Sequence, residues 1–470
     1  MTNAILRGKP DAGNPHVRFD EGEVASAKPR RGSLLYKGKA LFSLLLAIWA
    51  FGAFAVEPLR YDVTADRADC VARCGEKTTF TVTITGTNGL PVAAGTVRAT
   101  LDNFGTQQVA VATWDLAATN VFTLTGQLDA PGFLRIRFSP APEGKGAKVW
   151  SVAYEPEKIV KGSPSPMDFD AYWAGERARL RREVPLDPQV VRVPERCTAT
   201  FDFFRVSFAT FGRRVYGYLS VPTDTAKAPF PAHVEVNAAG FGGWTNDLNG
   251  RPDAICLRMS VYPFEPDWRW QASGLKRKYD ALNEACKAKY GCGYSCAGIA
   301  VSREDYFFHT VLLGIDRAVD WLAARPDVDR SRFAYEGTSQ GGGFGFYLTG
   351  LNHTFTRAAF YVPAITDTMG YRKGRQSGWP QIVENNSRTP EARAAAEKWA
   401  PYFDGANFAA RIACPVRVAV GFSDTTCPPA AVYAAYNAIR AQDKGIVHGL
   451  GMTHSCFGTF YSELGAWARK

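Results

Sequence analysis

The sequence predicts an α/β domain with a mostly parallel central sheet flanked by helices, preceded by an all-β sandwich of immunoglobulin-like size. Three observations support this prediction. The chain of 470 residues is too long for one ordinary hydrophobic core. Apolar and polar residues alternate with period two over 60–155, and from residue 231 onward strand-like runs alternate with helix-like runs.

The period-two pattern is clearest in two runs of the first part. Apolar side chains occupy every second position at Phe80, Val82 and Ile84, and again at Leu134, Ile136 and Phe138. Turn pairs lie beside these runs, at 88–89 and 131–132, as expected of short antiparallel strands. We assign residues 56–158 to the sandwich. Because it contains no catalytic constellation, we expect a structural or substrate-positioning role.

Residues 1–55 form a basic leader that ends in an uncharged apolar run at 40–55. The run closes with Ala53, Phe54 and Ala55, the small-residue pattern of a signal-peptide cleavage site. We therefore expect cleavage after Ala55 and a secreted or periplasmic protein. A membrane span needs about 20 residues, so the run is short for one; the alternative is a retained signal anchor, which alone would hold the protein at a membrane.

The net charge of +10 does not indicate a nucleic-acid partner. The leader alone holds eight basic and four acidic side chains. The remaining excess is spread along the chain without a basic run, whereas nucleic-acid binding needs a clustered patch.

All ten cysteines lie beyond Ala55, so export would carry them into an oxidising compartment. This favours local disulfides, between Cys70 and Cys74 and within the cluster of Cys286, Cys292 and Cys296. The spacing of the cluster also permits a metal site, but no histidine lies close to it in sequence. We expect no metal and no cofactor.

Residues 159–470 follow the order of an α/β domain. The pattern predicts a helix over 168–182, an antiparallel hairpin over 196–221, a strand over 232–237, an insertion around 261–300, a helix over 305–324 and a strand over 332–336. Alternation of this kind makes the central strands parallel.

The 332–336 strand leads into the motif Gly-Thr-Ser-Gln-Gly at 337–341, and a helix over 341–349 follows. A sharp strand-to-helix turn at the serine brings the backbone on both sides into close contact with its surroundings, and only glycine, which has no side chain, tolerates this crowding at 337 and 341. This arrangement is the nucleophile elbow of the α/β-hydrolase fold, and Ser339 is the predicted nucleophile. Such a serine needs a base, an acid that orients the base, and donors for the oxyanion.

The acid should follow a later strand. Asp424 comes directly after a predicted strand over 416–420 and is the predicted acid. Asp367, after a strand over 360–362, is the rival, because the acid of this fold can sit one strand earlier.

The base should come last in the chain, and two histidines follow Asp424. His448 lies inside the apolar run 446–450, which reads as the final strand. His454 lies in the loop beyond that strand and is the predicted base.

Two backbone amides should form the oxyanion hole. One is the N–H of Gln340, the residue after the nucleophile. The other belongs to the glycine-rich loop at 239–243, where we choose the N–H of Phe241 and leave Gly240 and Gly242 as alternatives.

Three further matches carry a family resemblance. They are Gly-x-Ser-Gln-Gly-Gly at 337–342, Asp424 with Pro428, Pro429 and the segment 432–437, and AspArgAlaValAspTrpLeu at 316–322 with ProAspValAsp at 326–329. Together they resemble carbohydrate esterase family 7, the acetyl xylan esterases and cephalosporin C deacetylases, over about 165–470. The first two elements are specific when they occur together.

The resemblance implies a serine esterase that removes acetyl groups from an acetylated oligo- or polysaccharide or a small acetyl ester. By the resemblance Ser339, Asp424 and His454 form the triad, and the 239–241 loop replaces the family's His-Gly-Tyr oxyanion loop. The family's Arg-Gly-Gln motif has no clear match, and Ser455 follows His454 where the family has Glu. These departures leave open the substrate and whether the chain forms a homo-oligomer.

Three tryptophans are candidates for stacking on a sugar ring: Trp268 and Trp270 in the insertion, and Trp379. Packing within a lid is the alternative interpretation. Two other functions also fit parts of the sequence. An exported serine peptidase of the prolyl oligopeptidase type shares the fold and residue order, but the sandwich is too small for its propeller. A glycan-binding protein with an inactive hydrolase domain is the other, and the complete triad argues against it.

Overall fold

The structure is a computed structural model that describes residues 59–139, 150–241, 250–267, 269, 274–454 and 459–470. The predicted leader, its apolar run at 40–55 and the cleavage site after Ala55 lie outside the described residues. Among the helices of the described part, none has both the length and the apolar character needed to cross a membrane.

The first part is the predicted all-β region. Its two sheets have the strand orders β1-β3-β6 and β2-β8-β7-β4-β5, and every pair except β2 with β8 is antiparallel. The alternating side chains predicted to face inward are buried, as at Phe80, Val82 and Leu134. The strands are β1 Leu59–Ala65, β2 Val71–Ala72, β3 Thr78–Gly86, β4 Thr96–Asn103, β5 Gln108–Asp115, β6 Val121–Gly126, β7 Gly132–Ser139 and β8 Ser151–Tyr154.

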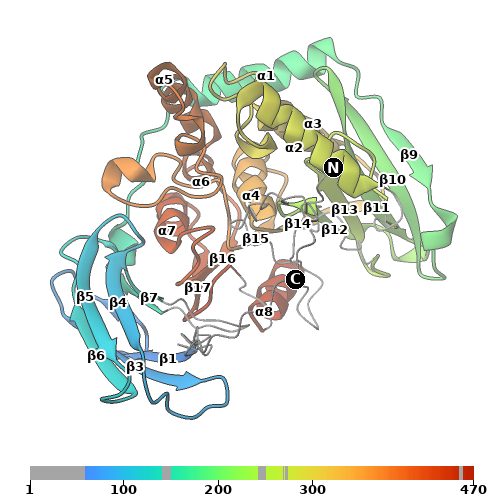
Figure 1. Cartoon of the computed structure of the whole chain (residues 1–470). Coiled ribbons are helices and arrows are strands. Elements are labelled where there is room, and N and C mark those ends of the chain that lie inside the picture. Colours follow the sequence, from blue (N-terminus) through green and yellow to red (C-terminus); the bar gives the residue numbers. More distant parts are fainter. Residues whose placement is uncertain (1–58, 140–149, 242–249, 268, 270–273, 455–458) are drawn as a thin grey trace, which may run out of the picture.

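The second part is built on a nine-stranded sheet of order β17-β16-β15-β14-β12-β13-β11-β10-β9 (Figure 1). Neighbouring strands from β13 to β17 are parallel, and β9 to β11 form an antiparallel extension that contains the predicted hairpin. This is the predicted α/β-hydrolase fold. The strands are β9 Gln189–Arg192, β10 Phe201–Thr210, β11 Arg213–Pro222, β12 Phe230–Val236, β13 Ile255–Ser260, β14 Val328–Thr338, β15 Arg357–Tyr361, β16 Val416–Gly421 and β17 Lys444–Gly449.

Helices cover both faces of the sheet, as parallel sheets require. Successive residues of β15 show this directly: Phe360 packs on Phe346 of α4, whereas Tyr361 belongs to a cluster with Leu464 of α8. The helices are α1 Phe169–Glu183, α2 Leu275–Tyr290, α3 Phe307–Ala323, α4 Gln340–Leu351, α5 Pro390–Trp399, α6 Gly405–Ala409, α7 Pro429–Ala438 and α8 Thr459–Ala468. The region of the predicted insertion holds α2.

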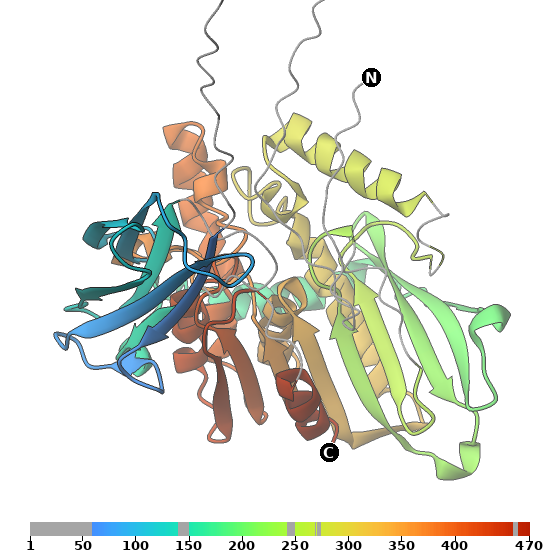
Figure 2. The same cartoon turned by 60° about the horizontal axis from the view of Figure 1, so that its bottom comes forward.

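The sandwich lies beside α7 and the β17 edge of the large sheet, away from β9 (Figures 1 and 2). The ring of Phe133 in β7 lies 5.8 Å from that of Tyr433 in α7. The side-chain amide of Asn437 donates to the carbonyl groups of Pro156 and Ile159, at 2.9 and 2.8 Å. The connecting segment and the sandwich are therefore packed onto the α/β domain.

Candidate active site

Ser339 occupies the turn between β14 and α4. Its φ of 54° and ψ of −117° are strained for a residue with a side chain. Three hydrogen bonds hold this backbone: its N–H donates to the carbonyl of Tyr361 at 2.8 Å, and its carbonyl accepts from Gly343 and Ala364, both at 2.9 Å. The hydroxyl is thus presented at the carboxyl end of β14 by neighbouring backbone alone.

The glycine at 341 is required by close approach. A Cβ atom at this position would overlap the carbonyl oxygen of Val236 at the end of β12. The first turn of α4 therefore packs directly against the strand that leads into the glycine-rich loop, which is the steric reason that the motif ends in glycine.

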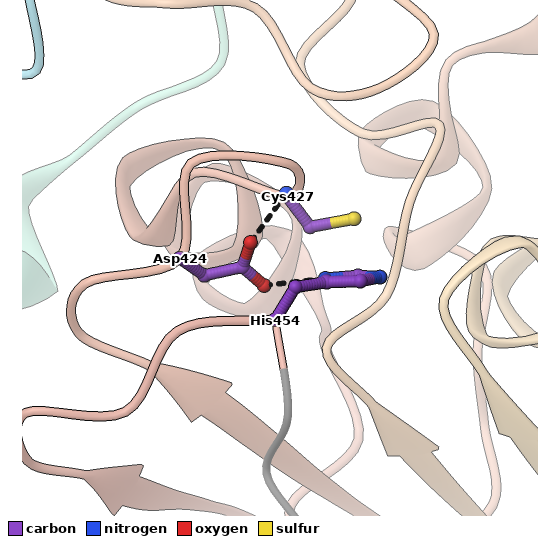
Figure 3. Close-up of side chains that lie close together, drawn as sticks. All are labelled: Asp424, Cys427 and His454. Atoms are coloured by element: carbon purple, nitrogen blue, oxygen red, sulfur yellow. Dashed lines mark hydrogen bonds and ion pairs between the residues drawn. The ribbon is translucent and has the colours of Figure 1, made fainter. Parts of the chain in front are cut away.

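Asp424 lies in the loop after β16 and is completely buried. Its Oδ1 accepts hydrogen bonds from the backbone N–H groups of Thr426 and Cys427, at 2.8 and 2.9 Å. Its Oδ2 lies 2.7 Å from Nδ1 of His454 (Figure 3). The turn thus aims one carboxylate oxygen at the imidazole and satisfies the other.

His454 lies between Asp424 and Ser339. Its Nε2 is 2.9 Å from Oγ of Ser339. Since the buried carboxylate accepts from Nδ1, the proton of the neutral imidazole belongs on Nδ1, which leaves Nε2 to accept from the serine hydroxyl. The imidazole is 27% exposed, so solvent reaches the site on the histidine side. The structure therefore brings the three residues predicted as nucleophile, acid and base into one hydrogen-bonded chain.

The rival residues lie elsewhere. Asp367 accepts from the guanidinium of Arg375 at 2.7 Å and from the N–H of Gly162 at 2.5 Å, so its carboxylate is engaged in a buried ion pair. His448 lies in β17, and its Nε2 is 2.6 Å from the hydroxyl of Tyr433. Burial lowers the pKa of His448. The hydrogen bonds of both side chains therefore go to partners other than Ser339, His454 and Asp424.

The two predicted oxyanion donors are joined by a buried polar network. The side chain of Gln340 donates to the carbonyl of Asn237 at 3.1 Å and accepts from the hydroxyl of Tyr294 at 2.8 Å. The hydroxyl of Tyr262 lies 3.3 Å from that of Tyr294 and donates to the carbonyl of Gly240 at 3.0 Å.

The network therefore ties the start of α4 to the loop that carries Phe241. Gly242, one of the alternatives to Phe241 as oxyanion donor, lies outside the described residues. Gly240 has a φ of 78°, which glycine adopts freely. Sequence reasoning missed both tyrosines, because nothing in their local pattern distinguishes them from core aromatic residues.

A cavity of about 810 Å³ lies next to the acid loop. Thr425 and Thr426, which follow Asp424, form part of its wall, together with Tyr294 and Trp379. Trp379, one of the predicted sugar-stacking residues, is largely buried there. The other two, Trp268 and Trp270, lie outside the described residues.

The predicted disulfides are not supported. No disulfide joins any of the nine cysteines in the described part of the chain. Sγ of Cys70 instead lies 3.8 Å from the carbonyl of Arg67, and Sγ of Cys292 lies 3.8 Å from Oδ1 of Asn386.

The sandwich contacts the acid loop itself. Phe133 packs edge-on against Phe422, two residues before Asp424, with ring centroids 5.2 Å apart. The hydroxyl of Ser151 in β8 donates to the carbonyl of Phe422. Trp150 packs over Gly451, in the segment that leads to His454. Sequence reasoning expected a structural role for the sandwich but did not identify this contact.

A family model described as acetyl xylan esterase (AXE1) matches residues 154–469. Acetyl esterase Axe7A of Xylanibacter ruminicola is 28% identical over 354 residues, which cover 73% of this chain and 76% of that protein.

Two solved structures share the fold. An acetyl xylan esterase from Paenibacillus sp. R4 has a TM-score of 0.56 and 22% identity, covering 67% of this chain and 98% of that chain. Acetyl Xylan Esterase 1 from Thermoanaerobacterium sp. JW/SL YS485 has a TM-score of 0.54 and 19% identity, covering 67% of this chain and 96% of that chain. The family match, over residues 154–469, spans the α/β domain.

Proposed function

This chain belongs to the acetyl xylan esterase family and is a carboxylic ester hydrolase, and from that premise we propose that it removes acetyl groups from acetylated carbohydrate through an acetyl-enzyme intermediate. The observation that carries the proposal is the hydrogen-bonded chain from Asp424 through His454 to Ser339, with separations of 2.7 and 2.9 Å. Such a chain activates an alcohol that is otherwise a weak nucleophile.

In the proposed cycle Ser339 Oγ attacks the ester carbonyl carbon while Nε2 of His454 takes the hydroxyl proton. Asp424 stabilises the imidazolium that forms and keeps the ring in its orientation. His454 then gives the proton to the sugar oxygen of the ester as the bond from that oxygen to the carbonyl carbon breaks. The sugar departs as an alcohol and the acetyl group stays on Ser339. A water molecule, deprotonated by the same nitrogen, releases acetate and restores the serine.

The developing oxyanion is assigned to the backbone N–H groups of Gln340 and Phe241. Support comes from the fixed start of α4 and from the tyrosine network that links Gln340 to the loop at Gly240. Donors that are held in place before the reaction need no reorganisation as charge develops, which makes their contribution large.

The carbohydrate part of the substrate is assigned to the cavity beside Asp424. Its wall combines hydroxyl groups from Thr425 and Thr426 with the aromatic faces of Tyr294 and Trp379. Polar groups beside flat rings suit a sugar, which presents hydroxyls at its edge and C–H groups on its face.

We also propose that the protein is exported, on the strength of the basic leader, the apolar run at 40–55 and the Ala-x-Ala sequence at 53–55. Recovery of a chain beginning at Val56 from the periplasm or medium is the expected result. Recovery of the intact leader at the membrane would replace export with anchoring.

The test is acetate release from acetylated xylan and from a chromogenic acetate ester. We expect the wild type to hydrolyse both and Ser339→Ala to lose roughly 10⁴-fold or more in kcat. Ser331→Ala is the matched control, because Ser331 lies in the exposed first part of β14 and both its hydroxyl and its N–H donate to Asp329.

Two outcomes would contradict the proposal. Full activity in Ser339→Ala would remove the serine from the mechanism. Hydrolysis of a prolyl amide substrate in place of both acetate esters would replace the esterase with a peptidase of related fold.

A further inference from the structure

Cys427 lies beside the pair formed by Asp424 and His454, on the turn that leads into α7 (Figure 3). One ligand atom from each of these residues, a carboxylate oxygen, an imidazole nitrogen and Sγ, lies within 4.8 Å of both others. Catalysis as proposed above uses the carboxylate and the imidazole but gives the thiol no part. In the described residues, this is the one group of three or more such side chains whose ligand atoms converge in this way.

We propose that Asp424, Cys427 and His454 form a binding site for a soft divalent cation, Zn²⁺ being the physiological case, and that the bound ion inhibits the esterase. Oxygen, nitrogen and sulfur ligands of these three kinds are those that Zn²⁺ takes in proteins, and three protein ligands leave a fourth position for water. Thiolate disfavours Mg²⁺ and Ca²⁺, which select oxygen ligands and higher coordination numbers.

The present spacing is close to what a tetrahedral ion needs. Zinc bond lengths of about 2.0 to 2.3 Å place tetrahedral ligands roughly 3.3 to 3.7 Å apart. The three atoms lie within 4.8 Å, so a contraction of roughly 1 Å, with a turn of the imidazole about its side-chain bonds, assembles the site. Asp424 and Cys427 are buried, whereas the imidazole is partly exposed, so an ion enters from the side on which His454 meets solvent.

Binding and catalysis exclude each other because they use the same imidazole. An ion on Nδ1 takes the lone pair of that nitrogen, and the ring proton moves to Nε2, which then cannot accept from Ser339. An ion on Nε2 occupies the accepting lone pair directly. On binding, the thiol proton of Cys427 passes to solvent, the Sγ–metal bond forms, and Asp424 contributes the charge it already carries. No oxidant or reductant takes part.

The inference is tested on the full chain by titrating Zn²⁺ against hydrolysis of a chromogenic acetate ester. We expect reversible inhibition of the wild type that EDTA relieves and that Mg²⁺ and Ca²⁺ do not reproduce. In Cys427→Ser, the Zn²⁺ concentration for half inhibition of that variant's own activity should rise at least tenfold, since even a residue behind a metal ligand contributes about 10-fold to 100-fold in affinity. Cys292→Ser, which alters another buried cysteine, should keep the sensitivity of the wild type.

A binding measurement separates the site from the reaction. Cd²⁺ added to Ser339→Ala should produce an ultraviolet thiolate-to-metal absorption band, and Zn²⁺ should raise the Tm of that variant. Both effects should be lost when either Cys427→Ser or Cys427→Ala is combined with Ser339→Ala. Two different substitutions are used so that poor folding of one of them does not decide the result. Because Ser339→Ala is not used as an enzyme here, failure of the esterase proposal would leave this readout intact. The proposal is overturned if Cys427→Ser shows wild-type sensitivity to Zn²⁺, or if the absorption band and the Tm increase survive both substitutions.

Discussion

The proposed nucleophile and its two proposed partners are held in place in different ways. Ser339 is held by backbone groups of the α/β domain alone, from Tyr361, Gly343 and Ala364. Asp424 and His454 lie on loops whose flanking residues pack against the sandwich, through Phe422 and Gly451.

The difference teaches that a triad can combine a locally determined residue with residues whose placement depends on a distant part of the chain. Strain at the elbow is tolerated because surrounding structure over-determines it. The acid and base loops are joined to each other by backbone hydrogen bonds, from Phe422 to Gly449 and from Ser423 to Met452, and the sandwich packs on both. An added domain in this position can adjust the geometry of the site without touching Ser339.

The largest expected effect is that of replacing the proposed acid, Asp424. Asp424→Asn should lower kcat by about 10⁴-fold while leaving the fold intact, because an amide at this position favours the wrong imidazole tautomer. The measurement is kcat on a chromogenic acetate ester, with circular dichroism to verify folding.

Asp367→Asn is the matched control for that variant. Asn is isosteric and tolerates the φ of 51° at this position, so the change mainly weakens the pair with Arg375. We expect a lower Tm and a kcat within tenfold of the wild type. The reverse ranking of the two variants would make Asp367 the acid.

The contact between the sandwich and the acid loop is tested by Phe133→Ala. Removing a fully buried phenylalanine should cost about 3 to 5 kcal/mol of unfolding free energy, and here it also frees Phe422. We expect kcat to fall severalfold at temperatures where the protein stays folded. Phe80→Ala is the control, since Phe80 is equally buried but lies in β3 of the other sheet. Equal kcat values for the two variants would show that the sandwich does not position the acid.

The nucleophile side is tested by Gly341→Ala. The added methyl group would overlap the carbonyl of Val236, so we expect a loss of about 3 kcal/mol in unfolding free energy, measured in urea. Gly175→Ala in α1 is the control, because no atom lies within 4 Å of its Cβ position. That change should stabilise the helix by about 0.5 to 1 kcal/mol. Similar effects of both changes would contradict the close approach of α4 to β12.

The last prediction concerns pH dependence and Asp404, which accepts from the backbone N–H groups of Asp367 and Thr368. Burial, and then the neighbouring Asp367, raise its pKa to about 6. The folded chain therefore holds this proton more tightly than the unfolded chain does. Its stabilising contribution is complete below about pH 4 and is lost as the pH rises through about 6, about 3 kcal/mol in total at about 1.36 kcal/mol per pKa unit.

The check for Asp404 is urea unfolding of the wild type and Asp404→Asn between pH 4 and pH 7. The difference in unfolding free energy between the two proteins should change over this range in the direction stated, and a constant difference would refute the shift. If Phe133→Ala shows the same pH dependence of the unfolding free energy, the titration of Asp404 is independent of the contact between the sandwich and the acid loop.

Much of the fold could be read from local pattern. Strand β14, the turn at Ser339 and helix α4 were predictable because glycine spacing and apolar periodicity are properties of adjacent residues. Asp424 and His454 could be proposed because α/β-hydrolases place their functional residues after successive strands, in a set order.

Other features could not be read in this way. Three features join residues far apart in the chain: the approach of Cys427 to His454, the network through the tyrosines at 262 and 294, and the contact of Phe133 with Phe422. None has a local pattern that distinguishes it from ordinary core packing. The predicted disulfides illustrate the opposite case, because Cys70 and Cys74 are close in sequence but no disulfide joins them in the structure.

The sequence by itself predicted Ser339 as the nucleophile, the order of its partners and the class of fold, since each depends on short-range sterics and on the alternation of buried and exposed positions. Only the tertiary structure decided which acid and which histidine meet the serine, what supports them, and that a thiol lies within reach of both. Those outcomes depend on where parallel strands place their carboxyl ends and on how a second domain packs against them, and neither is encoded in any short segment of the chain.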